Sequence, residues 1–322
     1  MKVLVTGGAG YVGSALVPLL LAGGHGVRVV DRLDHGGEPL LPVWTHPAFE
    51  FRRADICDRE AIAEAVDGVD AVVHLAAIVG DPAAARDPEA ARAINLSASK
   101  ELIEASRRAG VERFVFASTC SNYGRMEDGD SYVDENSELR PVSLYAETKV
   151  AIEKELLASN GAKHWHPTPL RFATVFGVSP RMRFDLTVNE FTMEMMTKKR
   201  LVVFGEQFWR PYLHVQDAAR AIRLVLESDP ELVSGQVFNV GSTEQNYQKQ
   251  TLVELIKPYA PDAAIEFVRK QEDPRDYRVS FGRIQDRLGF EITRTVPEGI
   301  NEVAQLVSGG IISDLSDGKY RN

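Results

Sequence analysis

The sequence predicts an α/β protein whose main domain is a doubly wound parallel sheet and whose C-terminal part is a smaller α/β lobe. Two observations carry this prediction. Short aliphatic runs alternate with helical stretches in the first half of the chain, the pattern of a parallel sheet with helices on both faces. The chain has 322 residues, 44% of them hydrophobic, which is enough for one large domain and a smaller lobe.

The predicted elements alternate regularly along the chain. Aliphatic runs predict buried strands at 2–6, 27–31, 51–53, 71–75, 114–118 and 167–172. Helical patterns lie at 11–22, 59–66, 89–109 and 142–160. After residue 177 prolines punctuate shorter segments, although 213–227 and 251–259 still look helical. We therefore expect a first domain at 1–177, a smaller discontinuous lobe at 178–322, and a segment near 213–241 that returns to the first sheet.

Composition and charge exclude several classes of protein. The 37 basic and 46 acidic side chains give a net charge of −9, which would repel a nucleic acid. No apolar run reaches the roughly 18 residues that span a membrane. The two cysteines, Cys57 and Cys120, show neither the spacing of a zinc site nor a disulfide framework, so we expect no metal and a cytoplasmic location.

A glycine-rich turn, TGGAGYVG at residues 6–13, joins the first strand to the first helix. It fits G-x-x-G-x-x-G from Gly7 and G-x-G-x-x-G from Gly8. Glycines let the backbone approach a pyrophosphate, whose charge is met by the N–H groups and dipole of the helix. An ordinary glycine-rich turn is the alternative. The residues expected to contact a dinucleotide here are Gly7, Gly10, Tyr11, Val12 and Gly13.

The ends of the next strands supply further candidates for a dinucleotide site. Asp31 lies 18 positions after Gly13, where a carboxylate accepts both adenosine ribose hydroxyls and repels a 2′-phosphate. NAD is therefore favoured over NADP, although Arg32 could pair with that phosphate. The other candidates are Asp55 and Ile56 for the adenine, and Leu75, Ala76 and Ala77 for the floor beneath the dinucleotide. The alternative for these residues is that they only pack at the strand ends, and His74 could be a core histidine.

A tyrosine and a lysine four positions apart, Tyr145 and Lys149, begin the predicted helix at 142–160. This spacing places the phenol and the ammonium on one helix face. The ammonium, together with a nicotinamide cation, would favour the phenolate, which can take a proton from a sugar hydroxyl. Upstream, Thr119 ends the fifth strand at the sheet edge where ligands bind, and it could donate a hydrogen bond to the reacting oxygen.

With these motifs, the sequence resembles the extended short-chain dehydrogenase/reductases that act on nucleotide sugars, the NAD-dependent epimerase/dehydratase family. The likeness rests on the TGGAGYVG turn, Asp31, Asp55-Ile56, HLAA at 74–77, Asn95, STCSNYG at 118–124, Tyr145 with Lys149, and RFATVFG at 171–177. It implies a Rossmann-type sheet, NAD as cofactor and a nucleotide sugar as substrate. It also implies that Tyr145 is the base, that Lys149 binds the nicotinamide ribose and lowers the tyrosine pKa, and that Thr119 binds the reacting oxygen. Asn95, Ser118 and Phe172 join the residues expected around the cofactor, with Asn95 supporting the catalytic helix.

The second lobe carries family motifs too, WRPYLHVQD at 209–217 and DPRDY at 273–277. Arginines at these places grip the nucleotide diphosphate in family members, which implies this role for Arg210 and Arg275; a surface ion pair is the alternative. Asn189 lies where relatives contact the diphosphate or sugar. Family members commonly pair through two long helices, which implies a homodimer through 89–109 and 142–160.

Two positions depart from the pattern of the dehydratases of this family. Dehydration after C4 oxidation needs an aspartate–glutamate pair after the threonine, where this chain has Cys120 and Ser121. Dehydration is thus disfavoured, and Cys120 is expected to be a small packing residue beside the substrate. The remaining reactions all oxidise or reduce a carbinol carbon of the sugar, most simply C4. The protein would then be an epimerase, a 4-dehydrogenase or a 4-ketoreductase.

The sequence leaves the substrate open. Thr174 stands where UDP-galactose 4-epimerase has an asparagine near the substrate. Residues 172–183 and 317–322 resemble a bacterial subgroup that contains GDP-heptose 4-dehydrogenases. A catalytically silent NAD-binding sensor or scaffold is the alternative from another class of protein. The intact Thr119, Tyr145 and Lys149 argue against it, because a sensor needs no proton relay.

Overall fold

The computed structural model describes residues 1–126, 131–269 and 276–322. Its main feature is a seven-stranded sheet in which every neighbouring pair of strands is parallel. Across the sheet the strands are β10 (Phe238–Val240), β6 (His166–Phe172), β5 (Arg113–Thr119), β4 (Ala71–His74), β1 (Lys2–Thr6), β2 (Gly26–Asp31) and β3 (Phe49–Arg53). The predicted Rossmann-type α/β class is confirmed.

Helices cover both faces of this sheet, and the side chains of β1 show why. Val3 and Val5 belong to one buried cluster and Leu4 to another, as expected when alternate residues of a strand point to opposite faces. The first cluster includes side chains of α1 (Tyr11–Ala22) and α8 (Val215–Glu227). The second includes side chains of α2 (Arg59–Val66), α5 (Ser99–Arg108) and α6 (Leu144–Ala158). A strand buried on both faces must be aliphatic throughout, which is why these runs were recognisable.

The predicted boundaries differ from the observed ones in few places. The helix expected at 89–109 is three consecutive pieces: α4 (Pro88–Arg92), a π-helical stretch (Ala93–Ala98) and α5. The segment around 213–241 provides α8, which packs against α1, then α9 (Pro230–Val233) and strand β10, which pairs with β6. The short helix α3 (Asp81–Arg86) follows β4, and α11 (Gly282–Leu288) contacts β10.

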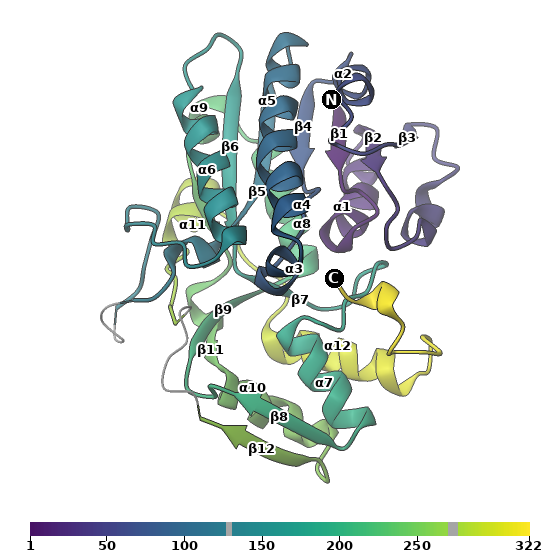
Figure 1. The fold of residues 1–322 in the computed structure, drawn as a ribbon, viewed down its shortest axis with the longest axis vertical. Coiled ribbons are helices and arrows are strands. Elements are labelled where there is room, and N and C mark those ends of the chain that lie inside the picture. The colour runs from purple at the N-terminus through teal and green to yellow at the C-terminus, as the bar shows by residue number, and fades with distance from the viewer. Residues whose placement is uncertain (127–130, 270–275) are drawn as a thin grey trace.

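The smaller lobe lies below the sheet in Figure 1 and has its own core. Strands β11 (Asn246–Gln248), β9 (Trp209–His214) and β7 (Thr174–Phe176) form a three-stranded sheet, and β12 (Ala264–Val268) pairs with β8 (Arg200–Phe204). Three helices, α7 (Thr187–Thr197), α10 (Lys249–Ile256) and α12 (Val296–Ser308), contribute buried side chains. The end of the chain lies between the two lobes in the same view.

Every helix within the described ranges is too short or too polar to span a lipid bilayer.

Candidate active site

A cleft of about 820 Å³ runs along the carboxyl ends of the parallel strands, where open α/β sheets bind ligands. Most residues predicted from the sequence line it, although they come from seven separate stretches of the chain. They are Gly7, Gly10, Tyr11, Val12, Gly13, Asp31, Asp55, Ile56, Leu75, Ala76, Ala77, Ser118, Thr119, Ser121, Tyr145, Lys149, Phe172 and Thr174. The structure thus brings the glycine turn and the Tyr145/Lys149 pair into one cavity.

The glycine turn has the shape that a dinucleotide phosphate needs. Gly7 has a φ of +74°, and a Cβ on Gly13 would lie 2.3 Å from the carbonyl oxygen of Gly7, so neither position accepts another residue without distortion. No side chain of the described residues caps helix α1, whose first N–H groups therefore remain for an anion at its N-terminus. These residues fit the pyrophosphate of a dinucleotide.

The end of β2 fits an unphosphorylated adenosine ribose. Asp31 lines the cleft and accepts hydrogen bonds from the backbone N–H groups of Ala9 (2.9 Å) and Leu33 (2.8 Å), which fix its carboxylate beside the glycine turn. The guanidinium of Arg32 instead contacts Asp55 Oδ2 at 2.9 Å and Asp34 Oδ2 at 3.1 Å. Because two carboxylates already hold Arg32, this geometry favours NAD over NADP.

Tyr145 and Lys149 occupy successive turns of α6, as their spacing predicted. The helix begins at Leu144 and is capped by Ser143, whose hydroxyl oxygen accepts from the N–H of Ala146 at 3.3 Å. Lys149 Nζ lies 5.8 Å from the centroid of the Tyr145 ring and donates to the carbonyl oxygen of Ala117 at 2.8 Å. It also lies 4.7 Å from the centroid of the Phe116 ring. The ammonium is thus anchored to β5 beside the phenol.

Burial dominates the ionisation of this pair. It raises the pKa of the Tyr145 phenol well above its ordinary value, and the charge of Asp81 adds to the rise. It also lowers the pKa of Lys149 to about 7, against a smaller opposing effect of Glu153. In the chain without a cofactor, burial raises the pKa of the phenol, and the lowering expected from Lys149 together with a nicotinamide cation stays a prediction. A nicotinamide cation would have to supply the missing positive charge.

A buried polar network lies behind these residues, and sequence reasoning missed it. Glu153, one turn after Lys149 on α6, is 1% exposed and forms an ion pair with Arg171 of β6, with Oε2 to Nη2 at 2.8 Å. Ser118 donates to the same carboxylate, and so does Asn122 Nδ2 at 2.8 Å. The i+4 spacing from Lys149 was the one signal available. The network ties the catalytic helix to β5 and β6.

Thr119 and Cys120 point in different directions. Thr119 lines the cleft, and its hydroxyl oxygen accepts from the N–H of Ser121 at 3.1 Å. Cys120 does not line it; its thiol is buried, donates to the carbonyl oxygen of Arg171 at 3.2 Å, and has a pKa raised well above the ordinary value by burial. Cys120 is therefore a packing residue, and its expected place beside the substrate is corrected.

Three other predicted residues, Asn95, Arg210 and Asn189, are buried and do not line the cleft. Asn95 brackets Ile78, accepting from its N–H at 2.8 Å and donating to its carbonyl oxygen at 2.9 Å, which fixes the backbone after β4. Arg210 is 7% exposed, donates to the carbonyl oxygen of Trp209 and stacks 5.3 Å from the ring of Tyr277, which does line the cleft. Arg275 lies outside the described residues.

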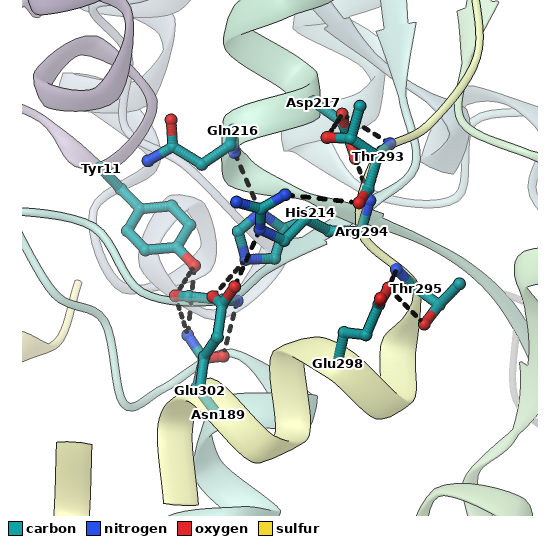
Figure 2. A network of polar contacts seen from close by, with 11 residues as sticks. Tyr11, Asn189, His214, Gln216, Asp217, Thr293, Arg294, Thr295, Glu298 and Glu302 are labelled. Atoms are coloured by element: carbon teal, nitrogen blue, oxygen red, sulfur yellow. Dashed lines mark hydrogen bonds and ion pairs between the residues drawn. The ribbon is translucent and has the colours of Figure 1, made fainter. Parts of the chain in front are cut away.

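Asn189, the third of these, is fully buried between the lobes instead of facing a ligand. Its Oδ1 accepts from the N–H of Gly177 at 2.9 Å, and its Nδ2 donates to Tyr11 Oη at 3.2 Å and to the carbonyl oxygen of Arg183 at 2.9 Å. Figure 2 shows this contact beside a second one, in which His214 and Glu302 hydrogen-bond at 2.9 Å. The predicted contact of Asn189 with the diphosphate is thus replaced by a role in joining the lobes.

His74 is a satisfied core histidine. Its ring nitrogens hydrogen-bond Thr6 Oγ1 at 2.7 Å and Ser99 Oγ at 2.8 Å, and burial lowers its pKa to about 3. The cleft also has lining residues to which the sequence analysis assigned no role. They are Asp81 and Arg86 of α3, Arg181, Arg183 and Asp185 before α7, and Arg321 and Asn322 at the end of the described chain.

Comparisons with known proteins agree with this geometry. The model of the NAD dependent epimerase/dehydratase family matches residues 3–241. A dTDP-glucose 4,6-dehydratase of Streptomyces griseus is 32% identical over 92% of this chain and 91% of its own length. An uncharacterized UDP-glucose epimerase of Bacillus subtilis is 31% identical over 96% and 98%.

Solved structures give the same result. The UDP-glucose 4-epimerase of Thermus thermophilus, in complex with NAD, superposes with a TM-score of 0.83 at 27% identity, covering 97% of this chain and 100% of that one. The dTDP-glucose 4,6-dehydratase DesIV of Streptomyces venezuelae, with NAD bound, gives 0.85 at 26% identity, covering 96% and 98%. The cofactor of the family is NAD, and the residues of the cleft fit it.

Proposed function

The chain belongs to the NAD-dependent epimerase/dehydratase family, and from that premise we propose that it acts on a carbinol carbon, most simply C4, in the sugar of a nucleotide sugar. One observation carries the proposal: Thr119, Tyr145 and Lys149 line the same cleft as the glycine turn. A proton relay and a dinucleotide site in one cavity are what reversible oxidation of a sugar hydroxyl requires.

Each of these residues has its own role in the proposed reaction. Bound NAD supplies the acceptor for the hydride that leaves the sugar carbon. Tyr145 Oη takes the proton of the sugar hydroxyl, and Thr119 donates a hydrogen bond to the reacting oxygen. Lys149, held by the carbonyl of Ala117, keeps a positive charge beside the phenol and the nicotinamide ribose. The family resemblance implies that Arg210 and Arg275 bind the diphosphate of the substrate; Arg210 stacks on Tyr277, which lines the cleft, and Arg275 lies outside the described residues.

Within the family, we propose epimerisation ahead of dehydration. Loss of water after oxidation needs an acid for one carbon and a base for its neighbour. The thiol of Cys120 is buried and bonded to the carbonyl of Arg171, and Ser121 carries only a hydroxyl. Neither replaces a carboxylate. Net dehydrogenation and ketone reduction use the same residues as epimerisation and are the second candidates.

A panel of UDP-, GDP-, CDP- and dTDP-sugars, incubated with the protein with and without added NAD, separates these reactions. An isomerised product without net change in the absorbance of reduced nicotinamide is the expected result. Accumulation of NADH would identify a dehydrogenase, and consumption of NADH a reductase. Loss of water from the sugar, seen by mass spectrometry, would contradict the exclusion of dehydration. No turnover of any sugar, with NAD still bound, would favour a sensor.

We further propose a homodimer through α5 and α6, on the family resemblance. The two helices lie side by side and are linked by an ion pair between Lys100 and Glu155 at 3.3 Å. Their outward faces carry charged side chains such as Glu104, so the interface would be polar. Light scattering at micromolar concentration tests this, and a monomeric mass would contradict it.

A further inference from the structure

Arg181 carries a buried guanidinium that pairs with no carboxylate of the described residues. It follows β7 in the chain, is 4% exposed and lines the cleft. Its Nη2 donates to the carbonyl oxygen of Arg321 (3.2 Å) and to Asn322 Oδ1 (2.8 Å), while its Nε is buried with no hydrogen-bond partner. Among the described residues it forms no ion pair. Since an uncompensated buried charge is costly, this site favours a bound anion.

The backbone around Arg181 is fastened to the dinucleotide side of the cleft. The N–H of Arg181 donates to Ser14 Oγ of α1 at 3.2 Å, and Ser179 Oγ donates to the carbonyl oxygen of Tyr11 at 2.7 Å. Both partners lie in the first turns of the helix whose N-terminal N–H groups have no side-chain cap. The backbone at Arg181 is therefore held beside the start of the helix whose N-terminal N–H groups would meet a phosphate.

Other charges around Arg181 agree with an anion in this part of the cleft. Burial, with a contribution from Arg183, lowers the pKa of Arg181 to about 10. Burial and the charges of Arg181 and Arg183 also lower the pKa of His35, a further lining residue. The nearby carboxylate of Asp185 is already bound by Arg183, with Oδ2 to Nη2 at 2.6 Å. Arg181 is thus left without a described carboxylate in ion-pair contact, although the charges of Asp31 and Asp185 also act on it.

The segment 320–322 holds this arginine from the other side. The carbonyl oxygen of Tyr320 accepts from the N–H of Phe184 at 2.9 Å, and the two rings meet edge to face with centroids 6.0 Å apart. The N–H of Asn322 donates to Asp185 Oδ2 at 3.1 Å, and Arg321 pairs with Glu190 of α7 at 3.6 Å. Arg321 and Asn322 themselves line the cleft. The segment therefore forms part of the cleft wall next to Arg181.

We propose that Arg181 binds the phosphate groups of the dinucleotide, and that segment 320–322 positions Arg181 and slows release of the dinucleotide. The proposal rests on NAD binding alone and is independent of the reaction at the sugar. The diphosphate of a nucleotide sugar has the same chemistry, but the attachment to Ser14 and Tyr11 favours the dinucleotide.

Binding measurements without turnover test both parts. Arg181→Met removes the charge and keeps the length of the side chain, and it should raise the dissociation constant of NADH by about tenfold or more, as for a lost charge-assisted contact. The dissociation constants of UDP and dTDP, measured by calorimetry, should change less than that of NADH. Asn322→Ala should increase the rate of NADH release, followed by nicotinamide fluorescence after mixing with excess NAD. Lys319→Ala, an exposed neighbour whose charge lies beside Asp317, is the matched control and should leave both quantities unchanged.

Three results would overturn the proposal. One is an Arg181→Met protein with the wild-type melting temperature and an unchanged affinity for NADH. Another is a larger loss of affinity for UDP or dTDP than for NADH, which would place the arginine in the substrate site. The third is an Asn322→Ala protein that releases NADH at the wild-type rate, which decides the role of the segment even if Arg181→Met does not fold.

Discussion

The ammonium of Lys149 lies 5.8 Å from the ring centroid of Tyr145, yet its hydrogen bond goes to the carbonyl oxygen of Ala117 on β5. The lysine acts on the tyrosine through space and not through a shared proton. Both groups are buried, which raises the pKa of the phenol and lowers that of the ammonium to about 7. The positive charge of a bound nicotinamide would favour the phenolate of Tyr145. Four predictions concern this pair and the residues around it.

Replacing Tyr145 with Phe should remove nearly all turnover and leave NAD binding within a few-fold. The substitution deletes the group that takes the proton and keeps the ring, and loss of a general base costs roughly 10²–10⁴ in rate. Turnover with the best sugar of the panel and NADH binding by fluorescence check this. Unchanged turnover in Tyr145→Phe would discard the proposed mechanism.

The stability of the protein should depend on pH through Lys149. Its pKa is lowered to about 7 by burial, so between pH 7 and about 10.4 the unfolded chain binds more protons than the folded one, and stability rises with pH. Lys149→Met lacks this contribution. The free energy of unfolding of the wild type, measured in urea without cofactor, should therefore rise relative to that of Lys149→Met from pH 7 to 9.5. Lys154→Met, which removes an exposed lysine from the same helix, is the control; parallel pH profiles for wild type and Lys149→Met would refute the prediction.

Asp31→Asn should narrow the preference for NADH over NADPH by about tenfold or more. The carboxylate at the end of β2 would repel a 2′-phosphate, and like charges in contact cost several kcal/mol. Dissociation constants for both dinucleotides measure the change. Asp70→Asn is the matched control, because Asp70 accepts from the backbone of Lys2, just before β4 and away from the cleft. An unaltered ratio in Asp31→Asn would mean that this carboxylate does not face the ribose.

Glu153→Gln should destabilise the protein by about 3–5 kcal/mol, since it leaves the guanidinium of Arg171 buried without its counter-ion. The control Glu155→Gln removes an exposed carboxylate on the same helix that pairs with Lys100, and should cost no more than about 1 kcal/mol. Urea unfolding of the two variants supplies the comparison. Equal stabilities would show that the network around Glu153 does not hold the catalytic helix.

Most of the first domain was predictable because its signals are local. Strands β1 and β4 are buried almost throughout and aliphatic over consecutive residues, and the predicted helix 11–22 coincides with α1. The second lobe was harder to predict, since β8 and β12 are short strands whose partners lie far away in the chain. The π-helical stretch before α5 carried no signal in the sequence that distinguishes it from an α-helix.

Some residues of the candidate site were likewise predictable from the sequence and others were not. Gly7, Asp31 and the Tyr145/Lys149 pair were recognisable, because a motif fixes each of them relative to its own strand or helix. The sequence placed Asn189 and Cys120 beside the ligand, but packing turned both side chains away from the cleft. Their orientation depends on partners elsewhere in the chain, such as Tyr11 and Arg171, which no local pattern specifies.

The sequence by itself determined the fold class, the glycine turn, the carboxylate at the end of β2 and the spacing of the tyrosine and lysine. Tertiary structure alone decided which groups lose their water and which charges meet. Burial raises the pKa of Tyr145, which no local pattern indicated, and the contact of Arg181 with Asn322 joins residues 141 positions apart. Desolvation and long-range pairing are properties of the packed molecule, whereas backbone geometry and periodicity are already present in the order of the residues.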